Sequence, residues 1–440
     1  MDRQRIGKSS HAPQGYPAQL LHAIGHLLPH RGLPLIESDG RMRWTDRLLA
    51  VMALVMAWQP AATLQDAFEG AWPVLTRMYG SRRRPGKTLA GYLKAIYRAS
   101  PRMLGVIGPH LRQKVQQVAR RSWRWRRWVV LAVDGSRVEC PRTAANEKAL
   151  HCAGRHKTGP QLSLTTIFHV GSGLPWDYRR GAGIESERNH LRDMCPGLPP
   201  RSLLLMDAGF TGFDLLRSLT EASHDFIVRV GANITLLRKL GYFTRQHEGI
   251  VHLWPEAHRH QPPLTLRCLT LKTPGRPVVL LTSLLSPQAL SDAEVAGWYR
   301  YRWRIEVNFR SLKQTLGKRK MLSDSPGQAK LELDWAVTGL WLLGLAAAEQ
   351  QRRRIRWSAA RALRVVRRAM NWGPRRVPSG GLRKQLRQAR MDSYVRHNPR
   401  KARDWPHKKN EPPATAPNIR RATRTEIRRA QAFYEQKLIT

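Results

Sequence analysis

The pattern of hydrophobic and polar positions divides the chain into a helical first part and a strand-rich middle. Between about residues 19 and 124, apolar residues recur at helical spacing, as in the segment TDRLLAVMALVMAW. Thr45, Thr63 and Thr88 stand where helices should begin, because threonine side chains cap helix N-termini. We therefore expect a helical region over 19–124, preceded by a flexible basic leader at residues 1–18.

From about residue 125 the pattern changes to short apolar runs that are typical of strands. Three strands are expected first, in WVVLAVDGSRVEC, QLSLTTIFHV and LPWDYRRGAG. A helix (ESERNHLRDMC), a strand (RSLLLMDAGF), a helix (TGFDLLRSLTEAS) and a strand (HDFIVRV) follow. This order is the one expected of a ribonuclease-H-like core, a mixed sheet covered by helices. The predicted fold class is therefore α/β, with the first part of this core at 125–230.

The remaining segments complete the expected organisation. Residues 231–290 hold four short strand-like pieces and form a β-rich insertion. The second part of the core is expected at 291–350, where the capping box S-D-A-E at Ser291 opens a helix that Gly317 closes. A hydrophobic helix follows near 331–349, and residues 351–440 form a basic, proline-broken C-terminal region.

Composition narrows the class of partner. Lysine and arginine number 76 against 31 aspartate and glutamate residues, which gives a formal net charge of +45. Because the basic residues are spread along the chain, a nucleic-acid backbone fits better than a small acidic substrate. The four cysteines form no CxxC pair, which argues against a zinc ribbon or a disulfide framework and favours a reducing cytoplasm. The longest apolar runs reach about a dozen residues, so we expect buried helices, no membrane partner and a soluble protein.

Two aspartates are the first candidates for chemistry. Asp134 and Asp207 each follow an apolar strand and precede a small residue, in VVLAVDG and LLLMDAG. A carboxylate at the end of a buried strand is costly unless a cation compensates it, and Mg²⁺ or Mn²⁺ would do so with oxygen ligands. The simpler interpretation is an ordinary turn aspartate, since Asp-Gly is a frequent turn pair. Asp177, Glu185 and Glu187 also lie near these residues in sequence, but they are not expected to be ligands.

A second pattern lies in the helix expected after Ser291. Tyr299, Arg302, Glu306 and Lys313 have the spacing Y-x2-R-x3-E-x6-K. At about 100° per residue, these four side chains fall within roughly a 60° arc of an α-helix. One carboxylate is thereby aligned with two cations and a phenol, which suits a metal ion beside a nucleic-acid phosphate. The alternative is a surface helix on which Glu306 pairs with Arg302 and Arg310.

This spacing resembles the signature of the insertion-sequence-four family of DDE transposases, and the resemblance covers roughly residues 128–317. It implies that three acids, Asp134, Asp207 and Glu306, are the catalytic residues and the ligands of two Mg²⁺ (or Mn²⁺) ions. It also implies that the three other motif residues bind DNA near the cut end: Tyr299, Arg302 and Lys313.

The resemblance implies a DNA transposase that cleaves the ends of an insertion sequence and transfers the strands into target DNA. Its partners would be double-stranded DNA, at the element ends and the target, and a second copy in the DNA complex, because two ends must be brought together. The location would be the bacterial cytoplasm, in association with the nucleoid, and excision would pass through a hairpin. The helical region at 19–124 could bind DNA ends or serve only as a scaffold. A nuclease with the same core and a catalytically inactive nucleic-acid-binding protein remain the alternatives.

Overall fold

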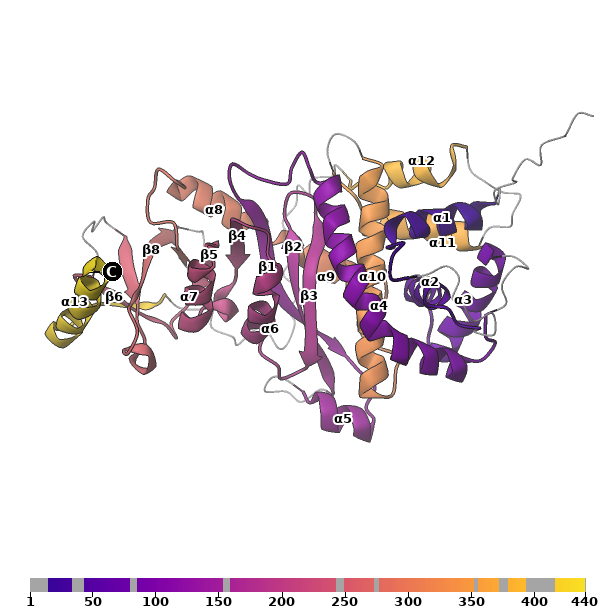
Figure 1. Cartoon of the computed structure of the whole chain (residues 1–440), viewed down its shortest axis with the longest axis horizontal. Coiled ribbons are helices and arrows are strands. Elements are labelled where there is room, and N and C mark those ends of the chain that lie inside the picture. The colour runs from indigo at the N-terminus through magenta and orange to yellow at the C-terminus, as the bar shows by residue number, and fades with distance from the viewer. Residues whose placement is uncertain are drawn as a thin grey trace, which may run out of the picture.

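One ten-stranded sheet runs through the middle of the molecule, with helices on both faces and a helical body at one end (Figure 1). The computed structural model describes residues 15–33, 43–79, 85–152, 159–242, 249–272, 277–351, 355–371, 379–392 and 416–439. The strand order is β10-β6-β7-β8-β9-β5-β4-β1-β2-β3.

Five of these strands form the ribonuclease-H-like core. They are β1 (Val129–Glu139), β2 (Gln161–His169), β3 (Leu174–Ala182), β4 (Ser202–Met206) and β5 (Asp225–Val230). β1 pairs antiparallel with β2 and β2 with β3, whereas β4 runs parallel to β1 and β5 parallel to β4. Helices α6 (Glu187–Met194) and α7 (Phe213–Glu221) lie between the strands in the expected order, and α5 (Ala144–Leu150) is an additional short helix after β1. The predicted fold class is confirmed.

The insertion continues the sheet of the core. Its strands are β6 (Thr235–Arg238), β7 (Ile250–Leu253), β8 (Leu264–Leu271) and β9 (Val278–Thr282), and each pairs antiparallel with the next. β9 then pairs antiparallel with β5, from Ile227 opposite Thr282 to Val230 opposite Val279. Short 3-10 turns lie at Cys195–Gly197, Ala208–Phe210 and Glu256–His258.

The helical body combines two segments that are far apart in sequence. The first contains α1 (Tyr16–Leu27), α2 (Asp46–Trp58), α3 (Leu64–Tyr79) and α4 (Leu89–Val118). The second contains α10 (Pro326–Glu349), α11 (Ala359–Asn371) and α12 (Gly381–Gln388). The indole of Trp58 donates to the Gly339 carbonyl at 3.1 Å, and that of Trp335 donates to Ser100 Oγ at 2.9 Å, so α10 is bonded to both α2 and α4. Figure 1 shows α10 alongside α4.

Three of these helices begin at capping threonines, and the long apolar helix α10 is mostly buried. Thr45, Thr63 and Thr88 each accept a backbone N–H three residues later, at 3.4, 3.1 and 3.3 Å, which confirms the three helix starts. Among the described residues, α10 is the one helix long and apolar enough to cross a membrane, but 89% of its most apolar window is buried inside the protein.

The segment with the Y-x2-R-x3-E-x6-K spacing is not one continuous α-helix, so that expectation was wrong. α8 (Asp292–Tyr301) begins with the expected capping box at Ser291, but it ends before Arg302. α9 (Arg304–Arg310) follows, and Ser311–Thr315 form a π-helical turn. The φ angle of Gly317 is 74°, a left-handed conformation that suits the expected glycine stop.

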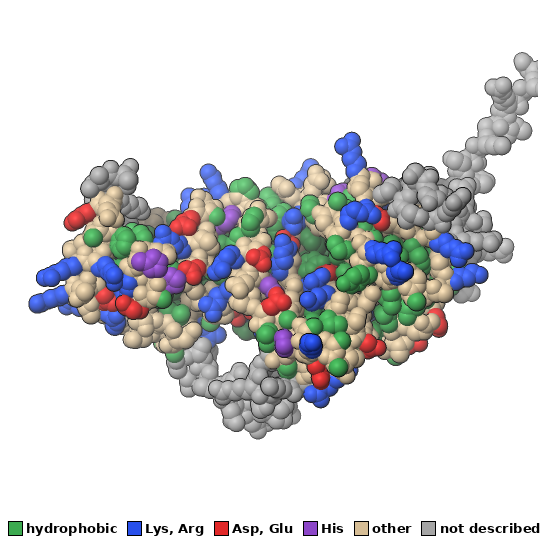
Figure 2. Space-filling view, turned by 60° about the horizontal axis from the view of Figure 1, so that its bottom comes forward, with side chains coloured by type: hydrophobic (Ala, Val, Ile, Leu, Met, Phe, Trp, Pro, Cys, Tyr) green, Lys and Arg blue, Asp and Glu red, His purple; other side chains and the backbone are tan. Residues whose placement is uncertain are grey.

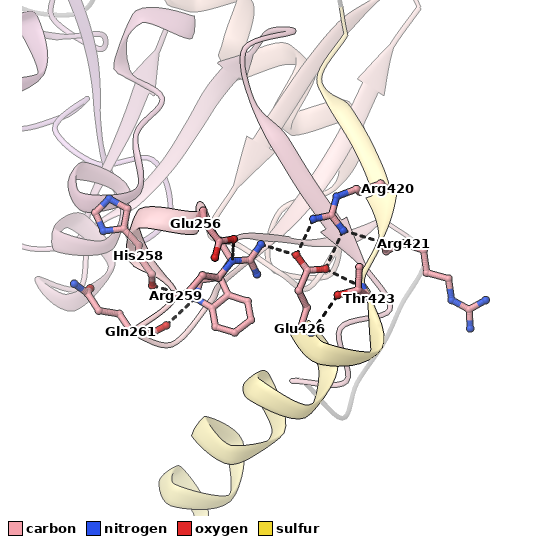
Figure 3. Close-up of polar contacts among 9 residues, drawn as sticks. Glu256, His258, Arg259, Gln261, Arg420, Arg421, Thr423 and Glu426 are labelled. Carbon is pink, nitrogen blue, oxygen red and sulfur yellow. Dashed lines mark hydrogen bonds and ion pairs between the residues drawn. The ribbon is translucent and has the colours of Figure 1, made fainter.

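The last described segment returns to the far end of the sheet. β10 (Asn418–Arg421) pairs parallel with β6, and α13 (Arg424–Ile439) follows it. The Glu426 carboxylate accepts hydrogen bonds from Arg259 Nη2 at 2.6 Å, from both Nη atoms of Arg420 and from the Thr423 N–H (Figure 3). One carboxylate thereby joins the C-terminal segment to the insertion.

Candidate active site

The pairing of two parallel strands brings Asp134 and Asp207 to the same level of the sheet. The last residue pair between β1 and β4 is Ala132 with Leu205, so each aspartate lies two residues beyond this pair in its own segment. Asp207 follows the end of β4, as expected, and its side chain accepts the Gly209 N–H at 2.9 Å. Asp134 is not at a strand end, because β1 continues to Glu139 in its pairing with β2.

A buried arginine connects the motif segment to the first aspartate. Arg302 lies in the break between α8 and α9, where its side chain turns inward and is only 7% exposed. Its Nη1 donates to Asp134 Oδ2 at 3.2 Å, and its Nε is buried without a hydrogen-bond partner among the described residues. Burial raises the pKa of Asp134 to about 6, with Arg302 opposing the rise and the charges of Asp207 and Glu187 adding to it.

Tyr299 lies next to Arg302, whereas Lys313 lies near the far end of β1. The Tyr299 side chain is buried, and the Arg302 guanidinium carbon lies 5.7 Å from its ring centre. Burial raises the Tyr299 pKa, and the nearby Arg302 and Arg229 charges oppose that rise. Lys313 stands in the π-helical turn, where burial and then Arg319 lower its pKa while Glu139, the last residue of β1, raises it.

Glu306 does not converge with the two aspartates in this side-chain arrangement. It stands in the first turn of α9, which packs against β1, and its side chain is exposed to solvent. No hydrogen bond or ion pair joins its carboxylate to another described residue, so the alternative pairing of Glu306 with Arg302 and Arg310 is wrong. Across the described ranges, no group of three or more His, Cys, Asp and Glu side chains is arranged to hold a metal ion.

Glu187 is the acid that lies nearer to the two aspartates, and sequence reasoning did not select it. It opens α6, and a β-carbon placed on Gly135 would overlap its carboxyl group. Burial raises the Glu187 pKa, Arg137 opposes the rise, and the charge of Asp207 adds to it. Gly135 was the residue from which the position of Glu187 could have been predicted. The sequence suggests a turn glycine, but in the structure Gly135 lies inside a strand and leaves room for the Glu187 carboxylate.

A separate basic cavity of about 1080 Å³ lies on another side of the motif helices. Its walls come from the end of α4, the turn between β2 and β3, α8, α9 and the segment around Trp357. Arg120, Arg304 and Arg356 line it, together with Tyr301, but none of the candidate catalytic acids does. Basic side chains are also spread along the whole length of the face that Figure 2 shows, with acidic side chains between them.

The strand order defines a core of the ribonuclease-H-like class, and comparison with known proteins relates this core to a family. Residues 125–342, about half of the chain, match the family described as Transposase DDE domain. The chain is 29% identical over 227 residues to the transposase InsG for insertion sequence element IS4 of Escherichia coli (strain K12), covering 48% of this chain and 50% of that protein. It is 28% identical over 153 residues to the putative transposase y4zB of Sinorhizobium fredii (strain NBRC 101917 / NGR234), covering 32% and 42%.

A cryo-EM structure of the piggyBac transposase synaptic complex with hairpin DNA aligns with 92% of this chain and 91% of that chain. Its TM-score is 0.44 at 11% sequence identity, a likeness too low to carry an argument of its own. Residues 125–342 match the DDE transposase domain family, and the chain is similar to the transposase of insertion sequence element IS4. It spans about half the length or less of the two curated relatives that it matches.

Proposed function

We propose that this protein is a DNA transposase, which cleaves the ends of an insertion sequence and joins them to target DNA. The observation that carries the proposal is the placement of Asp134 and Asp207 at one level on neighbouring parallel strands, with Arg302 reaching Asp134 from the motif segment. The match of residues 125–342 to the DDE transposase domain family supports the same reaction class. Two steps are needed: water hydrolyses a phosphodiester bond to free a 3′ hydroxyl, and that hydroxyl then attacks another phosphodiester bond.

The donor set fits a hard divalent cation. Asp134 and Asp207 offer carboxylate oxygens, which Mg²⁺ and Mn²⁺ prefer, and the two carboxylates lie close together at the ends of neighbouring strand pairings. We propose that Asp134, Asp207 and Glu306 hold two such ions, with Glu306 turning inward from α9. When bound, paired divalent ions activate the attacking oxygen and stabilise the leaving one.

The other motif residues are proposed to position DNA. Arg302 Nη1 contacts Asp134, and its Nε–H has no hydrogen-bond partner among the described residues, so Arg302 could hold Asp134 and a scissile phosphate together. The Tyr299 ring supports the Arg302 guanidinium. Lys313, which lies near the end of β1, would contact the DNA backbone there. The helical body and the basic C-terminal region would bind flanking duplex through their arginines. Because two element ends must be joined, we propose a homodimer in the DNA complex.

A cleavage and strand-transfer assay tests this function. The donor is a linear duplex that carries the inverted repeats flanking the gene, and the target is a supercoiled plasmid, both with Mg²⁺. The isosteric variants Asp134→Asn, Asp207→Asn and Glu306→Gln should cleave at background level while binding DNA nearly as the wild type does, because affinity comes from many cations. Asp193→Asn, an exposed acid on α6, is the matched control and should retain full activity.

The outcomes separate the alternatives. Cleavage by the wild type without any joined product would indicate a nuclease. No metal-dependent nicking by the wild type would indicate a binding protein that has lost catalysis. If Glu306→Gln alone retained wild-type cleavage, Glu306 would be excluded as a metal ligand. The assignment of Asp134 and Asp207 as ligands would remain. Arg302→Lys should restore only part of the activity lost in Arg302→Ala, since a point charge cannot reproduce a bidentate contact.

A further inference from the structure

The strand residue that follows Asp134 lacks a side chain, and an acid from another element fills the vacant space. An ideal β-carbon on Gly135 would overlap Cδ and both carboxyl oxygens of Glu187. The position cannot be filled by alanine without displacing that carboxylate. A glycine inside a strand often marks such a close approach, because every other residue would block it.

The same carboxylate also lies close to Asp207. The β-carbon position of Gly209 is 3.1 Å from Asp207 Oδ1 and 3.9 Å from Glu187 Oε2, so these two oxygens are no more than about 7 Å apart. Each Mg²⁺–oxygen bond is about 2.1 Å, and paired ions lie roughly 3.5–4 Å apart. Two oxygens within about 7 Å therefore fall inside the span of a two-ion site. Glu187 and Asp207 are thus close enough to bind the two ions of one site.

Neighbouring bonds fix the first turn of α6 over the strand. His190 Nδ1 lies 3.1 Å from Thr165 Oγ1, and Thr165 is the cross-strand partner of Gly135. His190 Nε2 lies 3.2 Å from Glu185 Oε2, and the other oxygen of Glu185 accepts the Ala182 N–H at 2.6 Å. Both carboxylate oxygens of Glu185 are therefore bonded within the segment from β3 to α6. Glu187 contacts Arg137 at 3.5 Å and keeps its second oxygen available.

We propose that Glu187 is a further carboxylate of the active site and shares with Asp134 and Asp207 in binding the divalent cations. This inference rests on the proposed function, because it concerns the same metal-dependent site. It also gives Gly135 a defined role, which is to admit the Glu187 carboxylate next to Asp134. The competing explanation is that Glu187 only forms a structural ion pair with Arg137.

Direct Mn²⁺ binding tests the proposal without relying on turnover. Free Mn²⁺ is measured by electron paramagnetic resonance during titration of the full-length protein, with and without bound duplex. Glu187→Gln should weaken Mn²⁺ binding at least tenfold or remove one ion from the stoichiometry. Asp193→Asn, an exposed acid on the same helix, should bind Mn²⁺ as the wild type does. Arg137→Gln removes the other partner of the ion pair and should also leave Mn²⁺ binding intact.

Each remaining result decides a different point. Wild-type Mn²⁺ affinity and stoichiometry in Glu187→Gln, alongside loss in Asp134→Asn, would overturn this inference and leave the proposed function standing. Unchanged binding in Asp134→Asn as well would overturn the metal assignment of the proposed function. Equal losses in Glu187→Gln and Arg137→Gln would identify the ion pair, not the carboxylate, as the cause. Gly135→Ala should reproduce the loss seen in Glu187→Gln, because it displaces the same carboxylate.

Discussion

Replacing Asp134 by asparagine should stabilise the metal-free protein at neutral pH. Burial, together with the charges of Asp207 and Glu187, raises the Asp134 pKa from an ordinary 3.8 to about 6 even though Arg302 opposes the rise. The carboxylate is therefore a charge that the folded protein holds at a cost. A shift of about two pKa units corresponds to about 3 kcal/mol, which is an upper estimate because asparagine also weakens the contact with Arg302.

The sign of the pH dependence follows from the direction of this shift. Because the folded-state pKa lies above the unfolded one, the cost is absent below pH 3.8, grows as the pH rises and is complete above about pH 6. The stability gain of Asp134→Asn should therefore be largest at pH 7–8 and should vanish near pH 4. Asp193→Asn, at an exposed position on α6, should show no such gain.

Thermal unfolding with a chelator present, measured from pH 4 to pH 8, is the appropriate assay. Adding Mg²⁺ should then raise the melting temperature of the wild type more than that of Asp134→Asn, because a cation that binds only the folded state stabilises it. A melting-temperature difference between the two proteins that does not change with pH would refute the electrostatic reasoning. A variant that is less stable than the wild type at pH 8 would refute it as well.

Three further outcomes are expected. Glu426→Gln should increase amide hydrogen exchange over 416–439 roughly tenfold, because hydrogen bonds from Arg420 lower the pKa of Glu426 to about 2 and the variant loses these bonds. Replacing the exposed Glu435 by glutamine is the control and should not change the exchange. Asp334→Ala should destabilise the protein by about 1–3 kcal/mol in denaturant unfolding, because it removes the buried carboxylate that the Arg180 guanidinium, itself 28% exposed, contacts at 2.7 Å. Affinity for any duplex should fall steeply between roughly 50 and 200 mM salt, and a salt-independent dissociation constant would contradict nucleic-acid binding.

Local sequence patterns determined much of the fold and part of the candidate site. The order of strands and helices followed from apolar periodicity, and the threonine caps and the capping box at Ser291 acted through bonds to residues three positions away. Asp134 and Asp207 were recognisable because each adjoins an apolar run that must be a buried strand. These features depend on residues close together in the chain, so the sequence carries them directly.

Only the tertiary structure decided which side chains meet. β1 continues past Asp134 because β2 supplies a pairing partner, and Arg302 turns inward because the helix breaks at that residue. Glu187 reaches the site through the packing of α6 over Gly135, and α10 bonds to α2, which lies 281 residues earlier at the contact. Each of these contacts joins segments that are distant in the chain. Their geometry is set by strand register and helix packing, which local patterns do not encode.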